Sequence, residues 1–286
     1  MDYYKLWDDK DFFFGKELEG FLAYANFSEA AMVLGDPVGK LEDFPALVHE
    51  FKQAQLRKGN KPCFFQLSSQ RLDLVQEQNF TTVKIGNEAL VNLEAFDIAD
   101  AKHRELRARL RLLDSLRYKV RHYKKINNKE LFAELRKVSR DWLNSGEEEK
   151  RFALGAYSPD YIRERTVMTV ENFAGNVVAF ISLVPSGVDG ELNMDLMRYS
   201  PEVSADVMDY LVLHAILFFK ELDYKRLNLG MIPSLLLDGS RDHASMILKA
   251  LMTKMKFLFV QPSLIEIKKR FADNLRPRYF AYLSDK

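Results

Sequence analysis

Asp195 and Arg198 lie in a short motif, DLMR, at the end of a predicted strand at residues 192–197. A carboxylate at such a place could take the proton of a hydroxyl or bind an amino group, and a guanidinium could hold a phosphate. The two residues are three positions apart, so they could equally form a salt bridge with each other. The spacing alone leaves both interpretations open, and we predict that Asp195 and Arg198 are the catalytic residues.

A second motif, NLGM, places Asn228, Gly230 and Met231 at the end of another predicted strand, at residues 226–231. A glycine has no side chain and lets the backbone approach a bound group closely. The ordinary explanation of this glycine is a tight turn before Pro233. We predict that Asn228, Gly230 and Met231 belong to a substrate-binding site.

Basic residues gather near the C-terminus, where they could hold an anionic group of a substrate. These residues are Lys268, Arg270, Arg276 and Arg278. Arg278 could instead pair with an acidic residue, Asp209 or Asp273. We predict Asp209, Lys268, Arg270 and Arg278 as substrate-binding residues.

The strongest charge asymmetry is at residues 102–125, which hold ten Lys or Arg residues against Glu105 and Asp114, in a chain of net charge +1. The segment has no Gly or Pro, and its leucines recur at helical spacing, so it predicts one amphipathic helix. Basic side chains on its outer face could meet the phosphates of a nucleic acid or of a lipid surface, and the alternative is a solvated helix face. The side chains that we expect to make such contacts are Arg104, Arg107, Arg111, Arg121 and Lys125.

Composition limits the classes of protein to which the chain can belong. Its 286 residues are 47% hydrophobic and 29% charged, which favours two lobes, and no apolar run is long enough to span a membrane. The N-terminus has no signal-peptide pattern, and a single cysteine excludes an internal disulfide and a multi-cysteine zinc site, as expected in the cytoplasm. We expect Cys63 to pack in a core, and the five histidines share no metal-ligand spacing, so we predict no metal. His243, beside Asp242, is a weaker candidate for a base.

The order of the predicted elements indicates a mixed α/β fold. The first half predicts strands at 21–26, 30–35, 63–67, 81–85 and 89–93 and helices at 45–59 and 72–78. The second half predicts a helix at 129–143 capped by Asn128, a hairpin at 166–185, strands at 192–197, 226–231 and 278–283, and helices at 206–222, 243–256 and 264–271. The order in the second half is that of a GNAT-type acyltransferase lobe. In such lobes the strands separate near NLGM and expose backbone N–H groups to an acyl carbonyl.

Several longer motifs carry a resemblance to a known family, in one collinear order over nearly the whole chain. They are FFF (12–14), GFLAYA (20–25), VLGDPVG (33–39), KIGNEALVNLEAF (84–96), EKRFALGAYSPDYI (149–162), NVVAFISLVP (176–185), DLMRYSPEVSADVMDYL (195–211), KELDYKRLNLGMIP (220–233) and IKKRFADNLRPRYFAY (267–282). On these motifs the chain resembles the cytosolic C-terminal domain of the multiple peptide resistance factor family, the aminoacyl-phosphatidylglycerol synthases. One short motif would be weak support, whereas the ordered set is specific. The family resemblance carried by these motifs implies a tandem pair of GNAT-like acyltransferase lobes, at 1–100 and 128–286, joined by a basic helix at 101–127.

The resemblance implies that the chain transfers a lysyl or alanyl group from its tRNA to a hydroxyl of phosphatidylglycerol, which changes membrane charge and resistance to antimicrobial peptides. One ester replaces another, so we predict no cofactor. The implied partners are aminoacyl-tRNA, held by the basic segment, and phosphatidylglycerol or a related anionic lipid. The resemblance also implies peripheral contact with the inner face of the cytoplasmic membrane, and a transmembrane flippase ahead of this domain in full-length relatives.

Two other functions stay open at this point. The chain could be a non-catalytic tRNA- or membrane-binding module of the same fold, or a transferase with a peptide or small-molecule acceptor. The glycine-rich loop that holds acetyl-CoA in ordinary GNAT enzymes is missing, which disfavours an acyl-CoA donor. The sequence departs from the family pattern at residues 234–239, 258–260 and Leu275, so it does not specify which amino acid is transferred.

Overall fold

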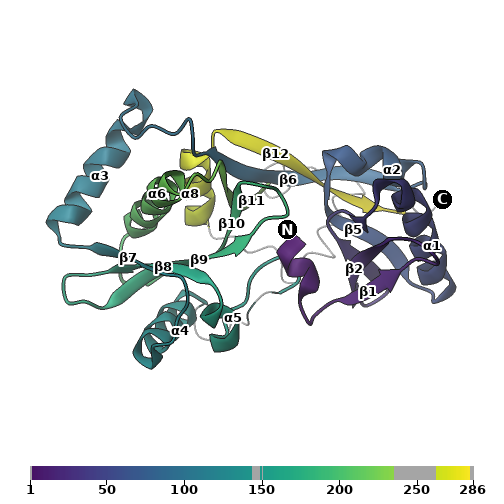
Figure 1. Cartoon of the computed structure of the whole chain (residues 1–286), viewed down its shortest axis with the longest axis horizontal. Coiled ribbons are helices and arrows are strands. Elements are labelled where there is room, and N and C mark those ends of the chain that lie inside the picture. The colour runs from purple at the N-terminus through teal and green to yellow at the C-terminus, as the bar shows by residue number, and fades with distance from the viewer. Residues whose placement is uncertain (1, 144–148, 150, 235–261, 284–286) are drawn as a thin grey trace. The chain divides into compact units, whose positions relative to one another are not determined.

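A computed structural model describes residues 2–143, 149, 151–234 and 262–283 of the chain (Figure 1). The described residues form two compact units. The first contains residues 2–88, 231–234 and 275–283, and the second contains residues 89–143, 149, 151–230 and 262–274. Most of the last strand of the chain belongs to the first unit.

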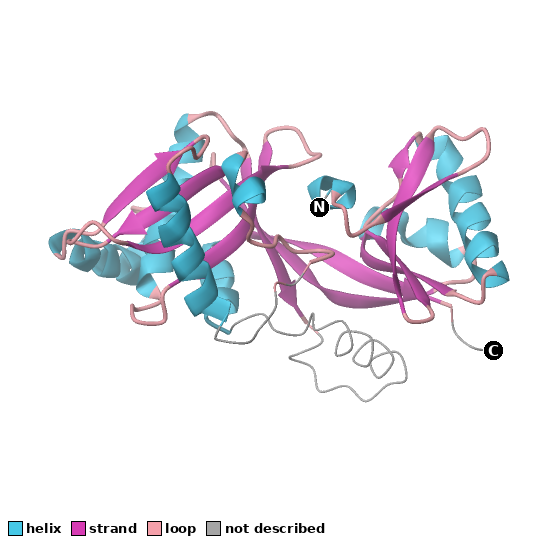
Figure 2. Ribbon diagram, turned by 90° about the horizontal axis from the view of Figure 1, so that it is seen from below, coloured by secondary structure: helices cyan, strands magenta, loops and turns pink. Residues whose placement is uncertain are grey.

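The first unit is a sheet covered by helices on one face (Figure 2). Its strands follow the order β1 (Asp11–Phe14), β2 (Gly20–Phe27), β3 (Ala30–Leu34), β5 (Lys61–Ser68), β12 (Asn274–Tyr282) and β6 (Thr81–Asn92), and β4 (Val38–Gly39) pairs with β2. Strands β3 and β5 are parallel. Helix α1 (Phe44–Arg57) makes the crossover between them, and the short helix α2 (Leu72–Gln76) precedes β6.

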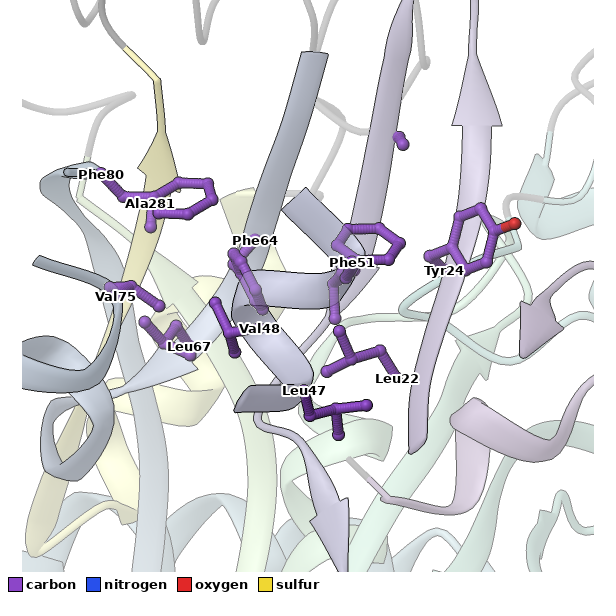
Figure 3. Close-up of a cluster of buried hydrophobic side chains, with 12 residues drawn as sticks. Leu22, Tyr24, Leu47, Val48, Phe51, Phe64, Leu67, Val75, Phe80 and Ala281 are labelled. Atoms are coloured by element: carbon purple, nitrogen blue, oxygen red, sulfur yellow. The ribbon is translucent and has the colours of Figure 1, made fainter. Parts of the chain in front are cut away.

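The core of the first unit lies between α1 and the sheet (Figure 3). Leu47, Val48 and Phe51 recur at helical spacing on α1 and are fully buried. They belong to one cluster with Phe64 and Leu67 of β5, which are also fully buried. The helix predicted at 45–59 and the strand predicted at 63–67 are therefore confirmed, because each has one apolar face that packs on the other.

The second unit has helices on both faces of its sheet (Figures 1 and 2). After β6, its strands follow the order β11 (Arg226–Pro233), β10 (Glu191–Tyr199), β9 (Val177–Pro185), β8 (Thr166–Glu171) and β7 (Lys119–Tyr123). Helices α4 (Lys129–Leu143) and α5 (Pro159–Arg163) lie on one face, and α6 (Asp206–Glu221) and α8 (Pro262–Phe271) lie on the other. Helix α3 (Arg104–Ser115) packs against α6.

Helix α4 begins where the sequence predicts it. The side-chain oxygen of Asn128 accepts hydrogen bonds from the backbone N–H groups of Glu130, at 2.8 Å, and Leu131, at 3.2 Å. These bonds satisfy donors of the first turn that have no partner within the helix. On the buried face, Leu131 and Leu135 pack in one cluster with Phe180 of β9.

The single basic helix predicted at 102–125 is wrong in its second half. Helix α3 ends at Ser115, because Arg117 adopts a left-handed conformation, with φ of 61°. The N–H of Tyr118 then donates to the carbonyl of Leu113 at 3.1 Å, which closes the helix end. The following residues form β7, which pairs antiparallel with β8. Pairing with a neighbouring strand therefore overrides the local helix propensity of this segment.

Other expected elements agree with the structure apart from their limits. The strands predicted at 81–85 and 89–93 are one strand, β6, and the helix predicted at 243–256 lies outside the described residues. The helices predicted at 206–222 and 264–271 correspond to α6 and α8. Within the described part of the chain, every helix is too short or too polar to cross a membrane.

Candidate active site

The candidate site lies where two parallel strands of the second unit separate. Strands β10 and β11 pair at only three positions, and the last of them joins Asn193 to Asn228. Both strands continue beyond this pair, so their backbones are no longer joined at Asp195 on one strand and Gly230 on the other. A gap of this kind between parallel strands exposes polar groups of both to a ligand. The sequence motifs DLMR and NLGM therefore lie on adjacent strands at this point.

Asp195 is held by three hydrogen-bond donors. Its Oδ1 accepts the backbone N–H of Gly155 at 2.9 Å, and its Oδ2 accepts the hydroxyls of Tyr161 at 2.6 Å and Ser182 at 3.1 Å. Burial, the Asp195 charge and the hydrogen bond to Asp195 raise the pKa of the Tyr161 phenol, so this group stays a donor. These donors fix the orientation of the Asp195 carboxylate.

An irregularity in β10 turns Asp195 toward helices α4 and α5. The pairing of β10 with β9 shifts register between Met194 and Met197, which is the mark of a β-bulge. Asp195 contacts α5 through Tyr161, and its neighbour Leu196 packs in the cluster beneath α4. Successive residues of a regular strand would point to opposite faces, so the bulge is what places both on this face.

Gly155, which precedes α5, Tyr161 of α5 and Arg165, which follows it, lie close to Asp195 or to one another. A Cβ atom at Gly155 would overlap the carboxylate oxygens of Asp195, so only glycine allows this close approach. The guanidinium of Arg165 lies 4.8 Å from the centre of the Tyr161 ring. Burial lowers the pKa of Arg165 and the charge of Asp195 opposes that shift, which places a cation near the carboxylate. The signal for Gly155 and Tyr161 was the motif EKRFALGAYSPDYI that contains both.

Arg198 is bound by Glu149 and Ser139. Its two terminal nitrogens donate to the two carboxylate oxygens of Glu149 at 2.7 and 2.6 Å, and one of them also donates to Ser139 of α4. Arg198 and Ser139 are buried. The guanidinium is thus engaged in a bidentate ion pair that links residue 149 to α4 and β10. This geometry favours a structural role for Arg198 over direct binding of a phosphate.

Lys268 approaches the gap from α8, on the face opposite α5 (Figure 1). Its side chain is buried, and burial lowers the pKa of the ammonium from 10.5 to about 8. A Cβ at Gly230 would lie 3.1 Å from its Nζ, and Gly230 has a φ of 87°, in the region that favours glycine. Gly230 therefore gives the amine access to the backbone of β11.

The three predicted residues of NLGM have different surroundings. The side-chain oxygen of Asn228 accepts the N–H of Gly230 at 2.9 Å, so this N–H is engaged within β11 and is not directed at a ligand. Asn228 is buried, next to the last paired position of β10 and β11. Met231 is half-buried and belongs to the first unit.

The other predicted substrate-binding residues form ion pairs. Asp209 of α6 is buried and pairs with Arg270 of α8 and, at 3.8 Å, with Arg109 of α3. Burial raises the pKa of the Asp209 carboxyl, and Arg270 opposes that shift. Arg278 donates to Glu88 at 2.7 Å in the first unit, so its acidic partner is neither of the two alternatives, Asp209 and Asp273. Strand β12 lies beside β6 in the sheet, which brings the arginine to Glu88.

The basic residues predicted to bind tRNA are partly engaged within the chain. Arg107 donates to the carbonyls of Ile98 and Asp100 at 2.5 and 2.7 Å. Arg121 pairs with Glu171 at 3.3 Å, and Lys125 pairs with Glu164 at 2.6 Å. Arg104 and Arg111 are exposed. For these last two, the described residues offer no ion-pair partner.

The described residues contain neither a candidate metal site nor a reactive thiol. No group of three His, Cys, Asp or Glu side chains there could hold a metal ion. Cys63 is buried in β5, and burial raises the pKa of its thiol to about 12, so it packs as an apolar residue, as expected. His243 lies outside the described residues.

Comparisons with known proteins agree with the motifs. The family model for the phosphatidylglycerol lysyltransferase C-terminal region matches residues 3–282. The phosphatidylglycerol lysyltransferase of Staphylococcus epidermidis is 30% identical over 278 residues, which are 96% of this chain and 33% of the relative. The chain thus spans about a third of the length of the curated relatives that it matches over most of its own length.

Two solved structures are similar over nearly the whole chain. The structure of L-PGS from Bacillus licheniformis has a TM-score of 0.84 and 28% identity, and the match covers 97% of this chain and 85% of that one. The C-terminal domain of a putative lysylphosphatidylglycerol synthetase from Agrobacterium fabrum has a TM-score of 0.82 and 29% identity, with coverages of 96% and 84%. The predicted mixed α/β fold is confirmed. The chain belongs to the family of the phosphatidylglycerol lysyltransferase C-terminal domain.

Proposed function

We propose that this chain transfers an aminoacyl group, lysyl or alanyl, from its tRNA to the glycerol hydroxyl of phosphatidylglycerol. The observation that carries the proposal is the carboxylate of Asp195, fixed by three donors beside the gap between β10 and β11. The names of the relatives support phosphatidylglycerol as acceptor and a lysyl group as one candidate for transfer.

In this proposal, Asp195 binds the donor. An aminoacyl ester carries a cationic α-ammonium group next to its reactive carbonyl carbon. Three donors orient the carboxylate, and its negative charge complements the positive charge of the ammonium group. This contact would place the carbonyl carbon at the gap, where Lys268 approaches from the other face.

Lys268 is the candidate general base. With a pKa of about 8, roughly a tenth of its amine is neutral at pH 7 and can accept a proton, compared with far less for a lysine at its ordinary pKa. The hydroxyl oxygen of the lipid attacks the carbonyl carbon, and its proton passes to Nζ of Lys268. The bond between that carbon and the ribose oxygen of the tRNA then breaks, and the ribose oxygen takes up the proton. One ester bond forms and one breaks, so the step needs no further reactant.

Arg198 acts as a positioning residue in this account. Its bidentate pair with Glu149 fixes the start of the segment that carries Gly155 and Tyr161. Both of these residues contact Asp195 directly. Arg198 would therefore influence the reaction through the position of the carboxylate, without touching the substrate.

The partners follow from the same proposal. Arg104 and Arg111 of α3 are the exposed candidates for contact with the tRNA backbone, a contact that weakens with salt. The acceptor lipid requires peripheral contact with the inner face of the cytoplasmic membrane. In a longer protein, a transmembrane flippase would supply a further attachment to that membrane.

A substrate panel tests the proposal. The purified chain is incubated with tRNA charged with radiolabelled lysine or alanine, and with phosphatidylglycerol or phosphatidylethanolamine in mixed detergent micelles. We expect a labelled lipid from phosphatidylglycerol and at least one of the two tRNAs. If every pair leaves the label on the tRNA or releases it as free amino acid, a non-catalytic module is the better account.

A further inference from the structure

Three large apolar side chains are exposed at one end of the second unit. Leu112 and Leu116 are four residues apart on the outer stripe at the end of α3, with exposed fractions of 58% and 50%. Phe173, in the turn between β8 and β9, is 81% exposed. The other leucines of α3, at 106, 110 and 113, are buried against the unit.

The register of the sheet brings these residues together. Lys119, the first residue of β7, is paired with Glu171, the last residue of β8. Because the strands are antiparallel, residue 117 before β7 lies toward residue 173 after β8. The turn that follows α3 and the turn that carries Phe173 therefore share one edge of the unit (Figure 1).

Two exposed cations lie close to the exposed apolar residues. Arg117 and Lys119 are both exposed, and they lie next to Leu116 in the sequence. Of the acidic residues on these two turns, Glu171 pairs with Arg121 at 3.3 Å, and Asp114 accepts the hydroxyl of Tyr210 at 2.6 Å. We call Leu112, Leu116, Arg117, Lys119 and Phe173 the turn patch.

Both turns are rigidly built. The side chain of Asn172 accepts the N–H groups of Ala174 and Asn176 at 3.0 and 3.1 Å, so the turn holds Phe173 outward. Arg117 has a φ of 61°, a conformation that glycine adopts without cost and other residues rarely adopt. The backbone conformation favours glycine at this position, so it does not account for the presence of an arginine there.

We propose that the turn patch docks the chain on an anionic lipid bilayer. Leucine and phenylalanine side chains enter the boundary between headgroups and acyl chains, and the two cations meet lipid phosphates. Exposed leucines have no comparable role on an RNA backbone, which is why the patch fits a membrane better than a tRNA. The inference rests on the proposed function, because phosphatidylglycerol is itself an anionic lipid, and it names the surface from which the acceptor is taken.

Vesicle sedimentation with the whole chain tests the proposal. We expect the chain to bind vesicles of equal parts phosphatidylcholine and phosphatidylglycerol, and not vesicles of phosphatidylcholine alone. The affinity of the double variant Leu116→Ser/Phe173→Ser for the anionic vesicles should be lower by about tenfold or more. The matched control is Leu41→Ser/Leu222→Ser, which removes two leucines that are 61% and 51% exposed elsewhere. Equal losses in both variants, or none in the first, would overturn the proposal.

Arg117 separates a docking role from a structural one. Arg117→Gly should keep or raise the midpoint of chemical unfolding, because glycine suits the left-handed turn, while vesicle binding falls. The matched charge variants are Arg117→Gln/Lys119→Gln and Arg104→Gln/Arg111→Gln. We expect the first to lose vesicle binding and the second to lose binding of tRNA in a gel-shift assay. The reverse assignment would make the turn patch an RNA surface and contradict the proposal.

A short-chain phosphatidylglycerol dissolved as monomers separates failure of docking from failure of the proposed reaction. With this acceptor, the Leu116→Ser/Phe173→Ser variant should transfer the aminoacyl group as fast as the unchanged protein, since no bilayer is present. A defect with this acceptor would mean that the two residues act in the reaction or the fold and not in docking. If the unchanged protein itself shows no transfer, the proposed function fails, while the vesicle measurement still decides whether the patch binds lipid.

Discussion

The hydroxyl of Tyr161 donates a 2.6 Å hydrogen bond to Oδ2 of Asp195, a residue 34 positions away in the sequence. The bond joins helix α5 to strand β10 at the point where β10 parts from β11. Ser182 of β9 donates to the same oxygen at 3.1 Å and also accepts the N–H of Leu196 at 3.1 Å. Three elements therefore hold one carboxylate, which gives the candidate site a fixed negative charge.

Tyr161→Phe should reduce transfer without unfolding the chain. Loss of the hydroxyl removes one of the three donors, and we expect kcat/KM to fall roughly tenfold to a hundredfold, since a hydrogen bond to a charged group contributes about 1.5–3 kcal/mol. Tyr157→Phe is the matched control, because its hydroxyl donates at 2.9 Å to the carbonyl of Phe132 and not to Asp195. Steady-state rates with a charged tRNA would show the difference, and equal rates for both variants would contradict the role of Tyr161.

Gly155→Ala should displace Asp195. The added methyl group would overlap the carboxylate, and the N–H of Gly155 would lose its 2.9 Å bond to Oδ1. We expect kcat/KM to fall by about a hundredfold or more, as a small misplacement of a substrate-positioning group does in other enzymes. The control is Gly175→Ala, where nothing lies within 4 Å of the new methyl group, although its φ of 84° predicts some loss of stability. Unchanged kinetics in Gly155→Ala would mean that this contact does not matter.

Loss of the ion pair between Arg198 and Glu149 should lower the stability of the fold more than the affinity for a phosphate-bearing substrate. Arg198→Met leaves a partly buried carboxylate without its partner, and we expect the free energy of unfolding to drop by about 3 kcal/mol. Arg198→Lys should rescue only part of this, because lysine cannot form the bidentate contact. Urea unfolding measures both changes. A variant that keeps full stability and loses only affinity for tRNA or lipid would show instead that Arg198 binds phosphate.

Lys268 sets the expected pH dependence. If its neutral amine takes the proton, kcat/KM should rise with pH and level off above the pKa of about 8. Lys268→Met should remove this limb together with most of the activity. A pH–rate profile that is flat between pH 6 and 9 would contradict the role of Lys268 as base; these limits are roughly two units below and one unit above the pKa.

Replacing Lys268 should lower activity but raise the stability of the fold. Folding lowers the pKa of Lys268 from 10.5 to about 8, so the unfolded chain binds more protons between these values, and the stability that depends on this group rises with pH through that window. At pH 7 the buried ammonium is unfavourable, and Lys268→Met should raise the free energy of unfolding by up to about 3 kcal/mol. Urea unfolding at pH 7 checks this. A variant less stable than the unchanged protein would show that Lys268 makes a favourable contact that outweighs its burial.

Much of the fold follows from the sequence, because apolar periodicity specifies helices such as α1 and α4 and β-branched runs specify β8 and β9. The basic segment shows the limit of this reasoning. Its composition favours a helix throughout, whereas pairing of Lys119–Tyr123 with β8 is a tertiary interaction that local propensity does not contain.

The candidate site was predictable in its motifs and not in its contacts. Asp195, Gly230 and Lys268 were identified from the sequence, and the structure places them at or near one gap between strands. The partner of Arg198 was not, because Glu149 is 49 residues away and nothing in the spacing of DLMR indicates it. The partner of Arg278 was not predictable for the same reason, since Glu88 is 190 residues away in the sequence and lies on the neighbouring strand.

The most direct test of the central claim is one transfer assay on two proteins, the unchanged chain and Asp195→Asn. Each is mixed with the charged tRNA that the substrate panel identifies and with phosphatidylglycerol in detergent micelles, and the labelled lipid is measured over time. The account predicts steady formation of aminoacyl-phosphatidylglycerol by the unchanged chain. It predicts a loss of about a hundredfold or more in Asp195→Asn, because the neutral amide cannot hold the α-ammonium group as the carboxylate does. Equal rates for the two proteins would contradict the account.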